Sequence, residues 1–459
     1  MKQLSIFITI AAVAAMLGTG FTAAAQKATY SLQQCRQLAL QNNASLKRAN
    51  IDISDARLQR EAARMSYLPT VSAGVSYFHA SDDMVKQRYD LTADDQQKLA
   101  ALVQQLGLNP AALASLPTSY EFKAFSHGMM ANITVLEPVY TGGRRPPAVK
   151  LADPPGQGKQ LMLQQTRDDV VKTTEVYYNR LLSLYEKLAT LDAVDRQLAS
   201  IHADAQNAID AGVGLRNDLL KVELKQNEMA ADRLTVENGI KLSKLVLAQY
   251  MGVMDKGDFD IDRTPVATVP DPVEYRTDHH AALDSLTEAR LLDKGVEAAK
   301  LQTRLKRGAL LPTLSVGAMG MYGTLTNEGR FKVAGLATLS VPISDWWSDR
   351  SVKRQIAAER KAEVDREDNR QMLLINMQNQ WDNLDNAYKQ VQLARKSIEQ
   401  SDENLRLNED YYKAGTSTMS DVLDAQTLSR QARDRYSDAV ASYLDCRTAY
   451  LQATGRQVQ

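Results

Sequence analysis

The sequence predicts an α+β fold built from two internal repeats, in which long helices are combined with pairs of short amphipathic strands. The first observation is self-similarity at a fixed spacing. Gly212 and Asp218 recur 203 residues later as Gly415 and Asp421, and the match continues without a gap for about forty residues. The other observations are long stretches without proline or glycine, and segments in which apolar and polar residues alternate.

Two proline landmarks extend the repeat upstream. Pro69 recurs as Pro312 at a spacing of 243 residues, and Pro138 recurs as Pro342 at a spacing of 204 residues. The first half therefore carries roughly forty additional residues between its landmarks. We expect each half to contain, in order, a helix, a strand, a loop, a strand, a long helix, a turn and a helix.

The long helices are predicted from the distribution of helix breakers. Proline is absent between residues 156 and 264 and after Pro342, and a stretch of 67 residues, 348–414, contains no glycine or proline. Inside a helix, proline costs about 3 kcal/mol and glycine about 1 kcal/mol. From residue 177 to residue 209 apolar residues follow a heptad pattern, interrupted by Asp195 and His202. An ordinary buried helix face would show the same pattern, but its length favours coiled-coil packing.

Four segments show the two-residue period of strands: 70–77, 129–135, 314–322 and 333–341. About ten residues suffice for a tilted strand to cross an outer membrane, although a half-buried strand in a soluble sheet has the same local pattern. Four isolated strands would leave two open edges, and the smallest transmembrane barrels have about eight strands. A homotrimer would supply twelve. The insertion between the first two strands, residues 79–126, is expected to contain a helix that begins after Thr92 and ends at Asn109-Pro110.

The N-terminus has the features of a cleavable signal peptide, residues 1–25. Lys2 precedes an apolar stretch, and Ala23-Ala24-Ala25 provides a small-residue cleavage site; an uncleaved anchor is disfavoured because the stretch is short. Cys35 lacks the preceding small residue of a lipoprotein signal, so no lipidation is expected there. Lys plus Arg and Asp plus Glu both number 55, which gives no indication of a nucleic-acid partner.

The order and spacing of four segments resemble TolC-type outer membrane efflux proteins, the outer membrane factors. These segments are the two turns, residues 211–218 and 414–424, and the two strand exits, residues 138–143 and 342–345. The resemblance covers essentially the whole mature chain. It implies a trimeric channel-tunnel in the outer membrane: four transmembrane strands per chain form a twelve-stranded barrel, which stands on a long periplasmic α-helical barrel.

The resemblance also implies a function. Such proteins are the outer-membrane exit channels of tripartite efflux or type I secretion systems, passive conduits gated at their periplasmic helix tips. The implied partners are two further copies of the chain, outer membrane lipid, a periplasmic adaptor (membrane fusion protein) and an inner-membrane pump. A secreted coiled-coil scaffold or periplasmic adaptor is the alternative. It would explain the helices but not the four amphipathic strands.

With this resemblance the chain divides, after the signal peptide, into four parts. Residues 26–252 form the first repeat, with a long extracellular loop between its strands, and residues 278–455 form the second. Residues 253–277 are an irregular connector in the equatorial region, because Pro265, Pro270 and Pro272 interrupt it. Residues 456–459 are a C-terminal tail.

The glycines of the two turns have a simple structural explanation. Gly212, Gly214 and Gly415 tolerate the positive φ angles that helix-to-helix turns require. The resemblance implies a second role, because the adaptor docks at this place in the family. The implied contact residues are these glycines together with Leu215 and Thr416.

Acidic residues follow both turns. Asp218 and Asp421 occupy equivalent positions, where a negative charge also favours a helix N-terminus. The repeat counterpart of Asp424 is Lys221, so the fold does not require an acid at that position. The resemblance implies that Asp421 and Asp424, with Asp218, form the periplasmic entrance constriction.

The resemblance also places Tyr412 and Asn217 in the contacts that close the tips. One departure from the family is Ser417, which stands where the best-known member has an arginine, so the closing contacts are expected to differ in detail. A larger departure is the cluster Pro146, Pro147, Pro154 and Pro155, in a segment that is helical in the second half. Either the upper part of this helix is broken or the segment carries unusual substitutions. If these prolines interrupt the helix, restoring helix formers there is predicted to stabilise the trimer.

No enzymatic motif is present. The sequence lacks a glycine-rich phosphate loop, a His-Glu-x-x-His pattern and closely spaced cysteine pairs. His279 and His280 are adjacent and do not form a metal site by themselves. We therefore expect no enzyme, no metal and no cofactor. Cys35 and Cys446 lie in separate helical segments, and a disulfide between them is not expected.

Overall fold

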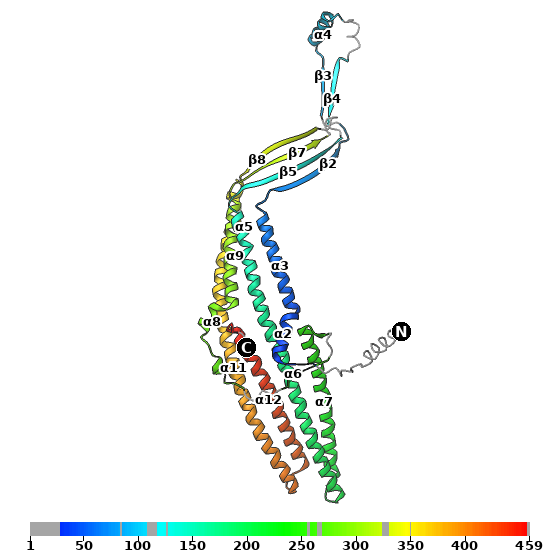
Figure 1. Ribbon diagram of the computed structural model, residues 1–459, viewed down its shortest axis with the longest axis vertical. Helices are drawn as coiled ribbons and strands as arrows, with labels where there is room; N and C mark the ends of the chain where they lie inside the picture. The colour runs from blue at the N-terminus through cyan, green and yellow to red at the C-terminus, as the bar shows by residue number, and fades with distance from the viewer. Residues whose placement is uncertain are drawn as a thin grey trace, which may run out of the picture. The chain divides into compact units, whose positions relative to one another are not determined.

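A computed structural model describes residues 28–82, 85–107, 117–124, 127–254, 258–263, 269–323, 330–348 and 350–456. The expected signal peptide, the loop at 324–329 and residues 457–459 lie outside the described residues. The chain forms two compact units. Unit 1 comprises residues 1–55, 157–294 and 364–459, and unit 2 comprises residues 56–156 and 295–363. The chain passes from one unit to the other within helices α3, α6, α9 and α11 (Figure 1).

Unit 1 is mainly helical. Its elements are β1 (Ala28–Tyr30), α2 (Leu32–Asn42), the first part of α3 (Ala44–Met65), most of α6 (Asp153–Asp210), α7 (Arg216–Met251), β6 (Phe259–Ile261), η3 (Pro272–Tyr275), α8 (His279–Ser285), the first part of α9 (Thr287–Ala309), most of α11 (Ser351–Lys413) and α12 (Met419–Ala453). The two long helices predicted from the absence of proline and glycine are confirmed. The sharp turns between α6 and α7 and between α11 and α12 lie where the repeat places them.

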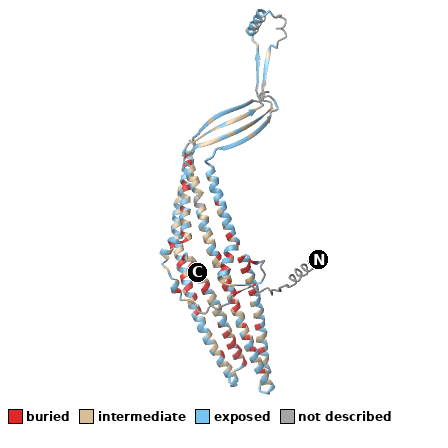
Figure 2. Ribbon diagram, viewed as in Figure 1, coloured by how far each residue is buried: buried red, intermediate tan, exposed pale blue. Residues whose placement is uncertain are grey.

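The heptad seam of α6 is buried along much of its length. Leu181 and Leu198 have no exposed surface, and the buried positions of Figure 2 recur along the helices of this unit. The polar interruptions of the seam are paired with α7: Arg233 Nη2 lies 2.6 Å from Asp195 Oδ2, and His202 Nε2 lies 3.6 Å from Glu223 Oε1. The pattern thus predicted a real packing face, with polar contacts where apolar residues are missing.

Unit 2 contains the four predicted strands in one antiparallel sheet of order β2-β5-β7-β8. The strands are β2 (Thr70–His79), β5 (His127–Thr141), β7 (Thr313–Gly323) and β8 (Arg330–Ser340). The repeats therefore meet where β5 pairs with β7, and β2 and β8 are the two edges. Val71, Val75 and Val333 are about two-thirds exposed or more (66%, 72% and 69%), so one set of apolar strand residues is uncovered within a single chain.

Within the described parts of the chain, no helix is both long enough and apolar enough to cross a membrane.

Strand β5 is longer than the sequence pattern indicated. The alternating pattern covered residues 129–135, whereas the strand spans His127–Thr141 and ends within the expected exit segment, residues 138–143. A register shift between Pro138 and Tyr140 accommodates the proline, because a bulge tolerates a residue without an N–H donor. Gly142, at φ 65°, follows the strand, and a Cβ there would lie 2.1 Å from the carbonyl oxygen of Gly308.

The insertion between β2 and β5 is more ordered than a loop. Helix α4 (Ala93–Gln105) begins after Thr92 as predicted, in a capping box with Asp95. It ends before Asn109-Pro110, which lie outside the described residues. Strands β3 (Val85–Asp90) and β4 (Ser119–Ala124) were missed, and they form an antiparallel ladder on either side of this helix. Both are only six residues long: β4 alternates Tyr120, Phe122 and Ala124 with polar residues, but over too short a stretch to be recognised, and β3 shows no clear alternation.

The expected helix break at the proline cluster is only partly correct. Helix α5 (Arg145–Leu151) ends at Ala152, and α6 begins at Asp153, so the chain is interrupted at one residue. The four prolines nevertheless lie inside helices, at the second and third positions of α5 and of α6. The first N–H groups of a helix have no intrahelical acceptor, so proline removes no hydrogen bond there. Restoring other helix formers should therefore stabilise the protein less than the sequence suggested.

The connector between the repeats also contains regular structure. Strand β6 pairs in parallel with β1, with Ala28 opposite Phe259, and the 3-10 helix η3 follows. These short elements escaped the sequence analysis because three residues are too few to show a period. Cys35 and Cys446 are both free thiols.

Candidate functional site at the two helix-to-helix turns

The turn between α6 and α7 ends the first helix in a Schellman motif. Gly212 has a φ of 78°, and its N–H donates to the carbonyl of Ile209 at 2.9 Å. The N–H of Val213 donates to the carbonyl of Ala208 at 3.0 Å. These two bonds satisfy carbonyls that a helix end would otherwise leave without partners. Glycine fits because the left-handed conformation penalises a Cβ atom.

The turn between α11 and α12 has the same backbone geometry. Gly415 has a φ of 74°, and its N–H donates to the carbonyl of Tyr412 at 2.9 Å. The N–H of Thr416 donates to the carbonyl of Tyr411 at 2.9 Å. Each residue stands 203 positions after its counterpart in the first turn, so the repeat extends to individual hydrogen bonds.

Gly214 is required for a different reason. A Cβ atom at this position would lie 2.6 Å from the backbone nitrogen of Ile209, so the constraint is close approach of the chain to itself. The turn presents apolar side chains to solvent: Val213 is 81% exposed and Leu215 is 67% exposed. Thr416, the equivalent of Val213, is also exposed.

Asp421 serves the start of α12. Thr418 is the N-cap, its hydroxyl accepts from the Asp421 N–H at 3.3 Å, and Asp421 Oδ2 accepts from the Thr418 N–H at 2.8 Å. The Thr418 and Ser417 hydroxyls donate to the same oxygen, at 2.6 and 3.1 Å. These hydrogen bonds, from the Thr418 hydroxyl first, lower the pKa of Asp421. The helix-end role weighed from the sequence is therefore present.

Asp218 does not repeat this arrangement. The N-cap of α7 is Leu215, which has no side-chain cap, and Asp218 Oδ1 instead lies 3.7 Å from Lys221 Nζ. Lys221 Nζ also donates to Ser420 Oγ at 2.8 Å, which joins α7 to α12. Sequence reasoning missed this link between the two hairpins. One signal was present in the sequence: Lys221 is the repeat counterpart of Asp424, so equivalent positions in the two hairpins carry opposite charges.

The other predicted residues differ in their surroundings. Asp424 is exposed and, within the described chain, makes no hydrogen bond or ion pair, and the same holds for Asn217. Tyr412 is half-buried against an apolar cluster that includes Val222 and Met419. Burial, with the nearby carboxylates of Asp218 and Asp204, raises the pKa of Tyr412. Tyr412 and Asp218 are thus neighbours across the two hairpins.

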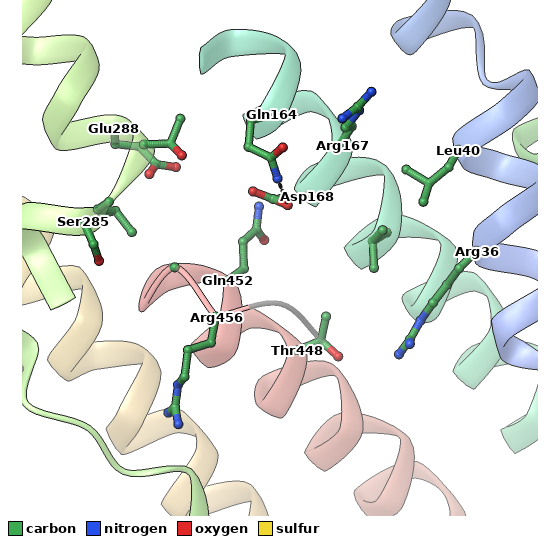
Figure 3. A pocket seen from close by; sticks show the side chains of 14 residues that line it. Arg36, Leu40, Gln164, Arg167, Asp168, Ser285, Glu288, Thr448, Gln452 and Arg456 are labelled. Atoms are coloured by element: carbon green, nitrogen blue, oxygen red, sulfur yellow. Dashed lines mark hydrogen bonds between the residues drawn. The ribbon is translucent and has the colours of Figure 1, made fainter. Parts of the chain in front are cut away.

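A second polar feature of unit 1 is a cavity of about 570 Å³, lined by residues of α2, α6, α12 and the segment joining α8 to α9 (Figure 3). Gln164 Nε2 donates to Asp168 Oδ1 at 3.0 Å, as the dashed line shows. Burial raises the pKa of Asp168, and the neighbouring carboxylates Glu288 and Asp169 add to the effect. Three arginines line the same space: Arg36 of α2, Arg167 of α6 and Arg456, which follows α12.

One ion pair and several hydrogen bonds join the helices around this cavity. Arg36 Nη2 lies 2.6 Å from Glu175 Oε1, and Thr448 donates to the other oxygen of that carboxylate. Gln452 Nε2 donates to Asp169 Oδ1 at 2.6 Å. Among the described residues, no group of three or more His, Cys, Asp or Glu side chains could hold a metal ion. The cavity lies at a junction of helices that are joined by the Arg36–Glu175 ion pair and these hydrogen bonds.

These features define a class of protein: a two-repeat chain in which each half provides two strands to one antiparallel sheet and one long helical hairpin. A family profile described as "Outer membrane efflux protein" matches residues 35–253 and 286–456. The chain belongs to the outer membrane efflux protein family. Its efflux role and outer membrane location follow from that membership, in a family of transport conduits rather than enzymes.

Solved structures agree on the fold. A membrane protein from Pseudomonas aeruginosa is 16% identical, with a TM-score of 0.71 over 92% of this chain and 93% of its own. The outer membrane protein VceC of Vibrio cholerae is 14% identical, with a TM-score of 0.66 over 93% and 97%. The open state of the Neisseria gonorrhoeae MtrE outer membrane channel is 17% identical, with a TM-score of 0.65 over 93% and 89%. No curated protein matches the chain by sequence.

Proposed function

We propose that this chain forms the outer-membrane exit channel of a tripartite efflux or type I secretion system. Three copies assemble, a periplasmic adaptor and an inner-membrane pump dock on the trimer, and substrate passes without chemical change. Family membership supports this role, as do solved relatives of the same fold that are described as outer membrane channels, such as MtrE and CmeC.

The main observation in support of the proposed trimer is the four-stranded sheet with two edge strands, β2 and β8. In lipid every backbone N–H and C=O group needs a partner, and an open edge leaves a row of them unpaired. Four strands are too few to close on themselves, whereas three copies supply twelve. The exposed valines of β2 and β8 then face lipid or a neighbouring copy instead of water.

The proposed gate lies at the two turns. Asp421 and Asp424 are both exposed on α12, three residues apart, and threefold repetition brings six carboxylates together. Asp218 belongs to the same proposed entrance. A ring of carboxylates attracts cations and narrows the opening. Tyr412 and Asn217 contribute to closure.

The proposed adaptor surface is formed by the turn residues themselves. Gly212, Gly214 and Gly415 set the backbone, and Leu215 and Thr416 present side chains. Exposed Val213 and Leu215 support this role, because neighbouring exposed apolar side chains mark interaction sites.

The gate is tested by conductance of trimers in planar bilayers. Asp424→Ala removes a carboxylate with no partner inside the chain, so folding is expected to be unchanged while cation selectivity and block by multivalent cations decrease. Asp94→Ala, in α4, is the matched control and should leave both properties unchanged. Purified protein should have a mass three times that of the mature chain. If cation selectivity and multivalent-cation block are unchanged in Asp424→Ala, Asp424 is not part of the gate. A monodisperse monomer would refute the proposed trimer.

A further inference from the structure

Basic residues gather where the helices of the second repeat meet its strands. Helix α9 ends shortly before β7, and α11 begins shortly after β8. Residues 304–311 and 350–358 contain no Asp or Glu, although basic and acidic residues are equal in number over the whole chain. Six basic residues lie in these two segments, and we call them the basic cluster: Arg304, Lys306, Arg307, Arg350, Lys353 and Arg354.

The basic cluster belongs to unit 2, and all six of its side chains are exposed. Among the described residues, none of the six makes a side-chain hydrogen bond or an ion pair. The indole Nε1 of Trp346, in the short helix α10 (Asp345–Ser348), donates to the carbonyl of Leu310 at 2.8 Å. This bond joins the segment before α11 to the segment after α9, so the two halves of the cluster are tied to each other.

The helix ends explain only half of the cluster. Lys306 and Arg307 lie in the last turn of α9, where a positive charge is favourable. Lys353 and Arg354 lie in the first turn of α11, where a positive charge is unfavourable and where no acidic residue compensates it. An anionic partner outside the chain would account for both halves.

The first repeat has the same distribution of charge. Residues 57–67, at the end of α3, and residues 142–151, which follow β5, contain one acidic residue, Glu61. The same two segments contain six basic residues: Arg57, Arg60, Arg64, Arg144, Arg145 and Lys150. In both repeats basic residues thus precede the first strand of the pair and follow the second, which indicates a property of this level of the molecule.

One contact shows on which face of the sheet these charges begin. Val71 lies opposite Val135, and Glu137 lies opposite Val316, so all four side chains share the apolar face of the sheet. Arg145 Nη2 lies 3.0 Å from Glu137 Oε1. The basic residues of the first repeat therefore reach the border of the apolar face, which meets lipid in the proposed barrel.

Aromatic residues lie between the apolar face and the charges. Trp346 and Trp347 are 55% and 64% exposed and stand between the end of β8 and the basic residues of α11. Tyr67 and Tyr140 are exposed at the corresponding ends of β2 and β5. Tryptophan and tyrosine are enriched at membrane–water interfaces, since their rings are apolar at one end and polar at the other. The order of apolar strand, aromatic ring and basic residue therefore matches hydrocarbon, interface and headgroup.

We propose that the basic cluster, with its counterparts in the first repeat, binds the anionic headgroups of phospholipids in the leaflet that the helices adjoin. This rests on the proposed function, which places the strands in the outer membrane. Lysine and arginine have long apolar stems, so their charged ends reach headgroups while the stems stay on the apolar border. Each basic residue near an anionic membrane surface adds to the attraction, which salt screens.

Quenching of tryptophan fluorescence by brominated lipids tests this proposal. Trp381→Phe removes the third tryptophan of the chain, so that Trp346 and Trp347 report on the lipids beside the cluster. Trimers are placed in vesicles of phosphatidylcholine and phosphatidylglycerol, with one or the other brominated. At equal lipid fraction, brominated phosphatidylglycerol should quench about twofold more strongly or better, because the cations concentrate anionic lipid around the rings. Molar salt should bring the two closer to equal.

A triple variant identifies the residues responsible. Arg350→Gln/Lys353→Gln/Arg354→Gln should lower the preference for phosphatidylglycerol and leave the circular dichroism of the helices unchanged, because these side chains have no partner among the described residues. The matched control is Arg395→Gln/Lys396→Gln/Lys413→Gln, three exposed cations in the part of α11 that belongs to unit 1, and it should keep the preference.

The possible failures are distinct. Equal quenching by the two brominated lipids, or an unchanged preference in the triple variant of the cluster, would refute binding of anionic lipid while leaving the proposed channel intact. Absence of quenching by either lipid would mean that Trp346 and Trp347 do not border the membrane. That result would overturn the placement of the sheet in the proposed function, and this proposal with it.

Discussion

The junction of Arg36, Glu175 and Thr448 should be a main determinant of the stability of unit 1. Arg36 belongs to α2, Glu175 to α6 and Thr448 to α12, so the three side chains tie together helices from distant parts of the sequence. The guanidinium lies 2.6 Å from the carboxylate, and Glu175 is only 1% exposed. We choose Glu175→Gln as the perturbation because it removes the charge and keeps the size.

The magnitude follows from what remains after the substitution. Arg36 is 9% exposed, so loss of the carboxylate leaves a buried positive charge without its counter-charge. Breaking one partner of a buried ion pair costs about 3–5 kcal/mol. Replacing both charged residues by apolar ones of similar size is often neutral or stabilising. We therefore expect Glu175→Gln to be strongly destabilising, and Arg36→Met/Glu175→Met to regain most of the loss.

The assay is urea denaturation of the detergent-purified protein, followed by the circular dichroism of its helices. Thr448→Val serves as an internal reference, because it removes only a hydrogen bond to the carboxylate and should cost about 1–3 kcal/mol. The reasoning is refuted if Glu175→Gln falls within about 1 kcal/mol of the unmodified protein. It is also refuted if the double variant is no more stable than Glu175→Gln.

Two further predictions concern pH and the turns. Burial raises the pKa of Asp168 above its usual 3.8, so ionisation of this carboxyl opposes folding as the pH rises through the elevated pKa. Asp168→Asn should therefore raise the melting temperature at neutral pH, and this gain should disappear below pH 3.8. A gain that does not depend on pH would argue against this cause. Gly415→Ala should destabilise by about 1–2 kcal/mol because of its positive φ, whereas Gly239→Ala in the middle of α7 should stabilise by about 1 kcal/mol. Melting temperatures of the two variants that move in the same direction would contradict the assigned backbone roles.

Much of the fold could be predicted from the sequence because its signals are long or repeated. The 63 residues of α11 contain no glycine or proline, and each repeat contains a pair of strands in which apolar and polar residues alternate. The turn glycines were predicted for the same reason, since Gly212 and Gly415 stand at equivalent positions. By contrast, β1, β3, β4 and β6 are three to six residues long, which is too short for a period to be recognised.

The candidate site was less predictable, because it depends on pairs of residues far apart in the chain. The Lys221–Ser420 contact joins residues 199 positions apart, and the charge difference between Lys221 and its repeat counterpart Asp424 does not indicate which residue Lys221 contacts. The prediction made from the proline cluster was only partly correct, for another reason. Proline lowers helix propensity on average, but the cost depends on its position, and the first turn does not need its N–H group. The break at Ala152 places Pro154 and Pro155 in such a turn.

Unit 1 is assembled from three segments, and the last of them ends at the C-terminus. Tyr450 and Leu451, near the end of α12, are among its buried residues, and β1 at the other end pairs with β6. The first repeat alone does not contain this whole core. A chain of which only the first repeat has been synthesised or exported therefore cannot complete unit 1. Contacts across so many residues make folding slow. Until α12 has been released, the apolar residues of this core stay exposed, so the unfinished chain needs protection from aggregation.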